Sequence, residues 1–111
     1  MGDFDRIIHE PARLLIVTIL AATVEADFNY LLQATKLTKG NLSTHLLRLE
    51  EAKYVAIEKG FRGKVPMTVV RLTHSGSSAL ENYRREMTKI LKPRKRSQQS
   101  YGTATFGVAP E

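Results

Sequence analysis

The sequence contains no cysteine, which excludes disulfide bonds, thiol redox sensing, cysteine nucleophiles and zinc sites with cysteine ligands. It also has no apolar run long enough to span a bilayer. The longest such run extends from Leu14 to Ala22 and is interrupted by Thr18. The residues around it lack the pattern of a signal peptide, so we expect a soluble, cytoplasmic protein.

Acidic residues are too few to balance the basic ones. The chain has 111 residues, enough for one domain, with 17 Lys and Arg against 11 Asp and Glu and a net charge of +6. The excess is uneven, because residues 1–37 are acidic on balance whereas residues 38–71 and 84–96 are basic. A surplus of this size predicts a polyanionic partner, either nucleic acid or an anionic membrane surface.

Hydrophobic periodicity predicts four helices and two short strands. The helices are expected at residues 10–24, 30–36, 38–52 and 73–92, and the strands at residues 54–59 and 67–72. Residues 25–28 are expected to form a short connection. Residues 60–66 contain two glycines and a proline, which predicts a hairpin loop longer than a tight turn.

Polar residues mark the starts of the predicted helices. Three of them can cap the following helix by accepting a backbone N–H: Asn29, Thr38 and Thr73. Inside the third helix, Leu42, Leu46 and Leu49 are spaced i, i+4 and i+7, which predicts one buried stripe.

Two helices joined by a tight turn and followed at once by a basic hairpin form the winged helix-turn-helix pattern. The predicted fold is therefore mostly α with a small β-hairpin. In this pattern the third helix presents polar side chains to the DNA major groove, and the hairpin places cations beside the backbone or minor groove. We expect residues 1–92 to form a DNA-binding and dimerisation domain, and residues 93–111 to form a basic, disordered tail.

The expected DNA contacts fall into two groups. The recognition helix offers polar and basic side chains outside its leucine stripe: Lys39, Asn41, Ser43, Thr44, His45 and Arg48. Asn can bond adenine through two hydrogen bonds, and Ser and Thr are short, adaptable donors. The wing tip offers two cations, Arg62 and Lys64. His45 is expected either as a polar contact or as a packed ring.

Five segments resemble the small MarR-like or ArsR-like winged-helix transcriptional regulators of prokaryotes. They are residues 5–14 (DRIIHEPARL), 37–46 (LTKGNLSTHL), 49–55 (LEEAKYV), 58–68 (EKGFRGKVPMT) and 72–76 (LTHSG). The resemblance covers roughly residues 4–92. It implies a homodimeric regulator of transcription, with repression favoured over activation because occupying a promoter needs no further surface.

Some positions depart from this family pattern. Val65 and Met67 stand where many relatives carry a further basic residue in the wing. Leu47 stands where a polar or basic residue is common. The long paired helices that frame the aromatic effector pocket of full-length MarR proteins are not evident. The sequence therefore names no effector class, and a small-molecule effector of unknown type stays open.

The first and last helices carry more apolar surface than so small a chain can bury alone. This excess predicts a homodimer interface formed by Leu15, Ile19, Tyr83, Met87, Ile90 and Leu91. One alternative is a winged helix that binds protein as an assembly module, which would need no basic wing tip. An enzyme is disfavoured because no nucleophile elbow or phosphate-binding loop appears. His9, His45 and His74 lack paired ligand spacing, so no metal or other cofactor is expected.

Overall fold

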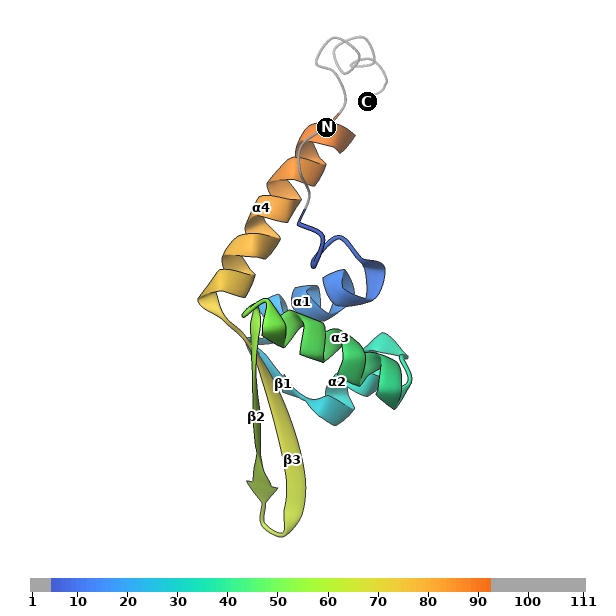
Figure 1. Ribbon diagram of the computed structural model, residues 1–111, viewed down its shortest axis with the longest axis vertical. Helices are drawn as coiled ribbons and strands as arrows, with labels where there is room; N and C mark the ends of the chain where they lie inside the picture. The colour runs from blue at the N-terminus through green and yellow to red at the C-terminus, as the bar shows by residue number, and fades with distance from the viewer. Residues whose placement is uncertain (1–4, 93–111) are drawn as a thin grey trace, which may run out of the picture.

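The computed structural model describes residues 5–92. These residues form four helices and a three-stranded antiparallel sheet, which confirms the predicted winged helix-turn-helix fold (Figure 1). In chain order the elements are α1 (Pro11–Thr23), β1 (Glu25–Asp27), α2 (Phe28–Thr35), α3 (Lys39–Glu51), β2 (Val55–Arg62), β3 (Val65–Leu72) and α4 (His74–Leu91). The prediction of a tail at residues 93–111 lies outside the described residues.

Each helix is preceded by a capping residue whose side chain accepts a hydrogen bond from a backbone N–H of the first turn. These capping residues are Glu10, Asp27, Thr38 and Thr73. The prediction that Asn29 caps the second helix is wrong. The Asp27 carboxylate accepts from the Tyr30 backbone N–H at 2.7 Å, so α2 already begins at Phe28.

The sheet differs from the prediction in two places. Residues 25–27 form strand β1, which pairs with β3 from Glu25↔Arg71 to Asp27↔Val69. The hairpin loop is a tight turn, because β2 and β3 stay paired up to Arg62↔Val65. Only Gly63 and Lys64 lie in the turn, and Gly63 has φ 63°, a left-handed conformation that glycine adopts without strain.

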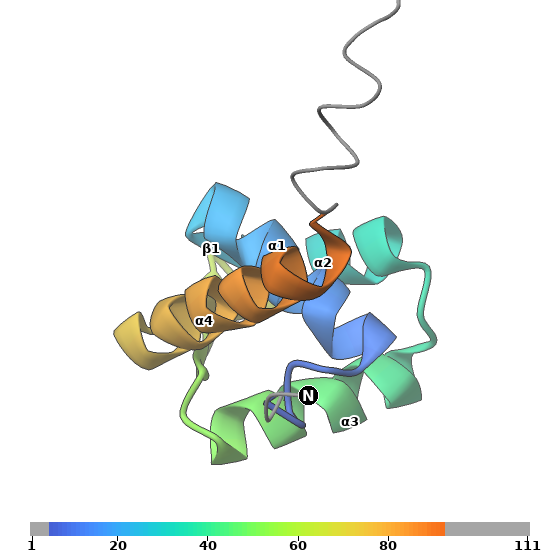
Figure 2. The same ribbon diagram turned by 90° about the horizontal axis from the view of Figure 1, so that it is seen from above.

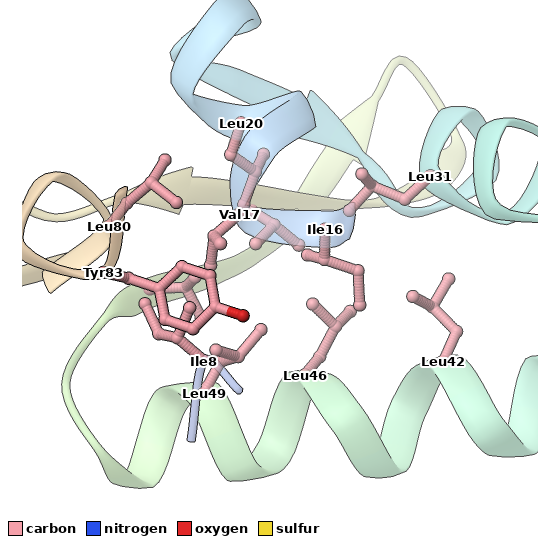
Figure 3. Close-up of a cluster of buried hydrophobic side chains, with 12 residues drawn as sticks. Ile8, Ile16, Val17, Leu20, Leu31, Leu42, Leu46, Leu49, Leu80 and Tyr83 are labelled. Carbon is pink, nitrogen blue, oxygen red and sulfur yellow. The ribbon is translucent and has the colours of Figure 1, made fainter. Parts of the chain in front are cut away.

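The core joins α1 to α3 (Figure 3). Ile16, Val17 and Leu20 of α1 are fully buried against the predicted leucine stripe of α3. The remaining buried hydrophobic residues come from every other element except β1, and from the segment before α1: Ile8, Leu31, Val55, Val70, Leu80 and Tyr83. This core fixes α3 on the rest of the domain and leaves its opposite face exposed.

The last helix packs on α1, on the side of the domain away from the hairpin (Figures 1 and 2). Its first three turns contribute Leu80 and Tyr83 to the core, whereas Ile90 and Leu91 near its end are exposed. Among the helices of residues 5–92, none has the length and apolar content needed to cross a membrane.

Candidate nucleic-acid interface

Helix α3 has one buried and one exposed side. Leu42, Leu46 and Leu49 are at most 3% exposed, whereas five of the six predicted recognition residues are exposed. Those five are Lys39, Asn41, Ser43, Thr44 and Arg48. The leucine spacing that predicted the buried stripe therefore also places these polar groups on the outward side.

The exposed side of α3 has two flanks. At roughly 100° per residue, Thr44 and Leu47 lie near its centre, with Ser43 on one flank and Arg48 on the other. The Ser43 flank faces the hairpin, because Ser43 and Leu47 line a groove with residues of β2 and β3. Two exposed glutamates, Glu50 and Glu51, end the helix, so its N-terminal and central turns are the part suited to an anionic ligand.

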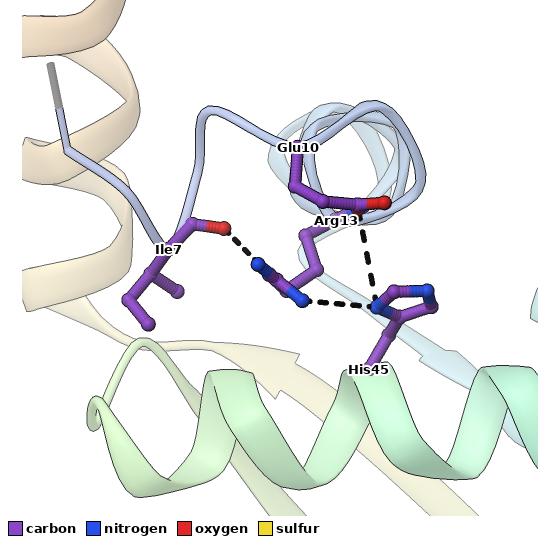
Figure 4. Close-up of polar contacts among 4 residues, drawn as sticks. All are labelled: Ile7, Glu10, Arg13 and His45. Atoms are coloured by element: carbon purple, nitrogen blue, oxygen red, sulfur yellow. Dashed lines mark hydrogen bonds and ion pairs between the residues drawn. The ribbon is translucent and has the colours of Figure 1, made fainter.

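His45 does not belong to the outward side. Its side chain is only 20% exposed and lies toward α1, where Arg13 Nη1 is 3.1 Å and Glu10 Oε1 is 3.9 Å from the ring Nδ1 (Figure 4). The Arg13 guanidinium can only donate, so His45 Nδ1 is the acceptor of this hydrogen bond. Arg13 Nε also donates to the Ile7 carbonyl at 2.7 Å. His45 thus connects the recognition helix to α1.

A second contact ties the N-terminal segment to the end of α3. The Tyr54 hydroxyl donates to the Asp5 carboxylate, whose other oxygen accepts the backbone N–H groups of Ile7 and Ile8. Burial raises the pKa of Tyr54 to about 12, and the hydrogen bond to Asp5 and the charge of Asp5 act in the same direction. The segment before α1 therefore braces α3 at two points, through Arg13 and through Tyr54.

The wing carries the two predicted cations at its tip, and both are exposed. Sequence reasoning missed a third, Lys59. Alternation along β2 places Lys59 on the same side as Val55 and Ile57, and it lines the groove beside Ser43 and Leu47. That alternation was the available signal, because Val55, Ile57 and Lys59 are two residues apart within the predicted strand at residues 54–59.

Two of the three acidic residues of the sheet, Glu25 and Glu58, are paired with a basic residue. Arg71 on β3 bonds Glu58 on β2 at 3.1 Å and Glu25 on β1 at 3.3 Å. These two hydrogen bonds, that to Glu58 first, raise the pKa of Arg71. The pairing links all three strands and leaves the hairpin tip basic.

The predicted dimer residues divide into three groups. Leu15, Ile90 and Leu91 are 42–70% exposed. Ile19 and Met87 are partly buried. Tyr83 is only 7% exposed and belongs to the core of its own chain, where its hydroxyl is 2.9 Å from His9 Nδ1. Between α1 and α4 runs a groove of about 620 Å³ with an apolar lining that includes Leu14, Leu80, Met87 and Leu91.

A recognition helix held by a rigid core, with a basic wing beside it, defines a winged helix-turn-helix DNA-binding protein. The family comparison agrees, since the family model described as a winged helix DNA-binding domain matches residues 12–91. The chain belongs to this family, and double-stranded DNA is its partner.

Individual relatives extend the comparison. An uncharacterized protein of Methanocaldococcus jannaschii is 34% identical over 88 residues, covering 78% of this chain and 95% of that protein. The solved structure of a transcriptional regulator homologue from Pyrococcus horikoshii is 28% identical with a TM-score of 0.75, covering 78% of this chain and 86% of that one. A MarR family regulator from Silicibacter pomeroyi shares the fold, with a TM-score of 0.54 and 17% identity over 84% of this chain and 66% of its own.

Proposed function

We propose that the protein binds a specific operator as a homodimer and represses transcription by occupying the promoter. The observation that carries this proposal is the placement of the exposed polar side of α3 beside a hairpin whose tip is basic. Five exposed polar or basic residues of α3 and three hairpin cations all lie within residues 39–64. A protein-binding module would have no need of these cations.

Base recognition is assigned to α3. Asn41 can pair with adenine through two hydrogen bonds, and Arg48 can pair with guanine in the same way. Thr44 supplies a short donor near the centre of the exposed side, and Ser43 supplies another on the flank that faces the hairpin. Lys39 is the first residue of α3, where free backbone N–H groups also favour a phosphate. His45 acts indirectly, by holding α3 against α1.

Backbone contact is assigned to the wing. The turn that carries Lys64 and the adjoining Arg62 is exposed on all sides, which suits flexible contact with phosphates better than fixed contact with base edges. Lys59 adds a third cation nearer to α3. Each phosphate contact contributes to the salt dependence of binding and little to sequence preference.

Dimerisation is assigned to the outer surfaces of α1 and α4. Leu15, Ile90 and Leu91 expose apolar side chains that a second copy would cover, and the groove between the helices offers a seat for its α4. A two-fold dimer would present two recognition helices to half-sites about one helical turn, roughly 34 Å, apart on the DNA. The proposal leaves a small-molecule effector open.

Selection of bound sequences from a random duplex library tests this function. We expect a palindromic site with half-sites one helical turn apart, and a dimer in sedimentation at micromolar concentration. Met87→Glu places a charge in each copy of the interface and should shift the protein toward monomer while weakening operator binding. Asn82→Glu, at an exposed position of α4 that does not line this groove, tests whether added charge alone has this effect. A monomeric wild type, or enrichment of no sequence, would contradict the proposal.

A further inference from the structure

Leu47 is an apolar side chain in the middle of a polar surface. It is 53% exposed and lies roughly 140° around α3 from the centre of the buried leucine stripe. All the other exposed residues of α3 are polar, charged or glycine. Thr44 lies one turn before Leu47, and Arg48 follows it directly. The side chain is therefore placed where the helix would meet base edges.

The fold does not need Leu47. The core is completed by Leu46 and Leu49, which are at most 3% exposed. Leu47 instead borders the open groove of about 790 Å³ between α3 and the hairpin, together with Ser43 and Lys59. The partly buried Phe28 and Ile57 lie deeper in this groove. A single exposed leucine among polar groups is too small a patch for a stable protein interface.

The ligand that fits this surrounding is a base with an apolar group. In the major groove thymine presents its C5-methyl group, and an apolar side chain recognises it by excluding water from both. We propose that Leu47 is a specificity-determining residue that contacts the methyl group of one thymine in each half-site. This inference rests on the proposed function. Leu47 would select thymine, whereas a polar residue at this position of α3 would prefer a different base.

Replacement of thymine by uracil isolates the methyl group, because the two bases otherwise present the same hydrogen-bonding atoms. On the selected operator, uracil is introduced at one symmetric pair of positions at a time and the affinity is measured. Burial of one methyl group corresponds to about a fourfold change in affinity. Wild-type protein should therefore bind about 15-fold more weakly when both half-sites lose the methyl group at the critical position.

Leu47→Ala provides the decisive comparison. It should bind the thymine and uracil operators with nearly equal affinity at that position, while its response to uracil elsewhere stays that of wild type. Thr44→Ala is the matched control on the same side of α3. It should weaken binding to both operators by the same factor and so keep the 15-fold preference for thymine. Because Leu47 is exposed, the alanine variant should keep the melting temperature of wild type, which is measured alongside.

Two results would overturn the inference. In one, wild type loses no affinity with uracil at any position, or Leu47→Ala keeps the full preference for thymine. The protein would then bind DNA without this contact. In the other, Leu47→Ala changes the oligomeric state in sedimentation, which would assign Leu47 to a protein interface. Failure of both proteins to bind any selected duplex would instead refute the proposed function itself.

Discussion

Gly76, in the first turn of α4, is packed more tightly than any other glycine of residues 5–92. A Cβ atom added there would overlap the Tyr54 carbonyl oxygen and lie 2.7 Å from Leu72 Cδ1. The same carbonyl accepts the Thr73 backbone N–H at 3.0 Å. Gly76→Ala would therefore push α4 away from the end of α3 and disturb a hydrogen bond that joins them.

The cost can be worked out from these contacts. Overpacking of this kind costs about 1–3 kcal/mol, and a weakened backbone hydrogen bond adds about 1 kcal/mol. The usual preference of helices for alanine over glycine returns about 1 kcal/mol. We expect the free energy of unfolding to fall by about 1–3 kcal/mol, which lowers the melting temperature by roughly 5–20 °C in a domain of this size.

Gly40→Ala is the matched control. Gly40 also lies in the first turn of its helix, but a Cβ atom there would meet nothing within 4 Å. This variant should gain about 0.5–1 kcal/mol, because only the helix preference acts. Urea unfolding followed by circular dichroism measures both variants. Equal stability of the two variants, or a Gly76→Ala protein as stable as wild type, would refute the packing argument.

Three further outcomes follow from the structure. The pKa of Tyr54 is about 12 in the folded protein against 10.0 for a free tyrosine, so its stabilising effect is complete below pH 10 and is lost as pH rises through 12. Partial exposure of Tyr54 limits this effect to about 1–2 kcal/mol. The difference in stability between wild type and Tyr54→Phe, measured by urea unfolding, should therefore shrink as the pH rises from about 10 to about 12. Lys53→Gly should stabilise the domain by about 1 kcal/mol in the same assay, because Lys53 has φ 66° and follows α3. Arg62→Ala and Lys64→Ala should weaken cognate and scrambled duplexes by a similar factor and lower the salt slope by about one unit each; loss of sequence preference at an unchanged slope would reverse the roles of wing and helix.

Helix α3 was predictable because its signals are local. Thr38 caps it, and the leucine spacing defines both its buried side and the exposed side that bears Asn41 and Arg48. Each of these signals lies within four residues of the next. The exposed recognition residues followed from the same pattern, without any knowledge of what α3 packs against.

Long-range contacts account for what the sequence did not predict. Strand β1 has three residues, too few for an alternating pattern, and exists because β3 pairs with it. Pro66 suggested a loop, but β1 pairs only with residues 69–71, so one edge of β3 is open at Pro66 and a missing N–H is tolerated there. For His45 the sequence left a polar contact and a packed ring both open, because its partner Arg13 is 32 residues away.

The Arg13 contact joins the helix proposed to form the dimer to the helix proposed to bind DNA. Arg13→Met keeps the aliphatic stem but removes the bonds to the Ile7 carbonyl and to His45. Hydrogen bonds from a charged donor contribute about 1.5–3 kcal/mol when buried, and partial exposure here reduces the expected loss of stability to about 2 kcal/mol for the two bonds together. Arg6→Met is the control, at an exposed position in the segment before α1, and should change stability by less than about 0.5 kcal/mol.

A double-mutant cycle shows whether Arg13 acts through His45. His45→Ala should destabilise wild type by more than it destabilises Arg13→Met, with a coupling of about 0.5–1.5 kcal/mol in urea unfolding. Operator binding gives an independent measurement, since a recognition helix less firmly held by α1 should lose affinity at the cognate site more than on scrambled duplexes. Additive changes in stability would mean that Arg13 stabilises only the N-terminal segment, through Ile7. The position of α3 would then depend on the leucine stripe and on the contact between Tyr54 and Asp5.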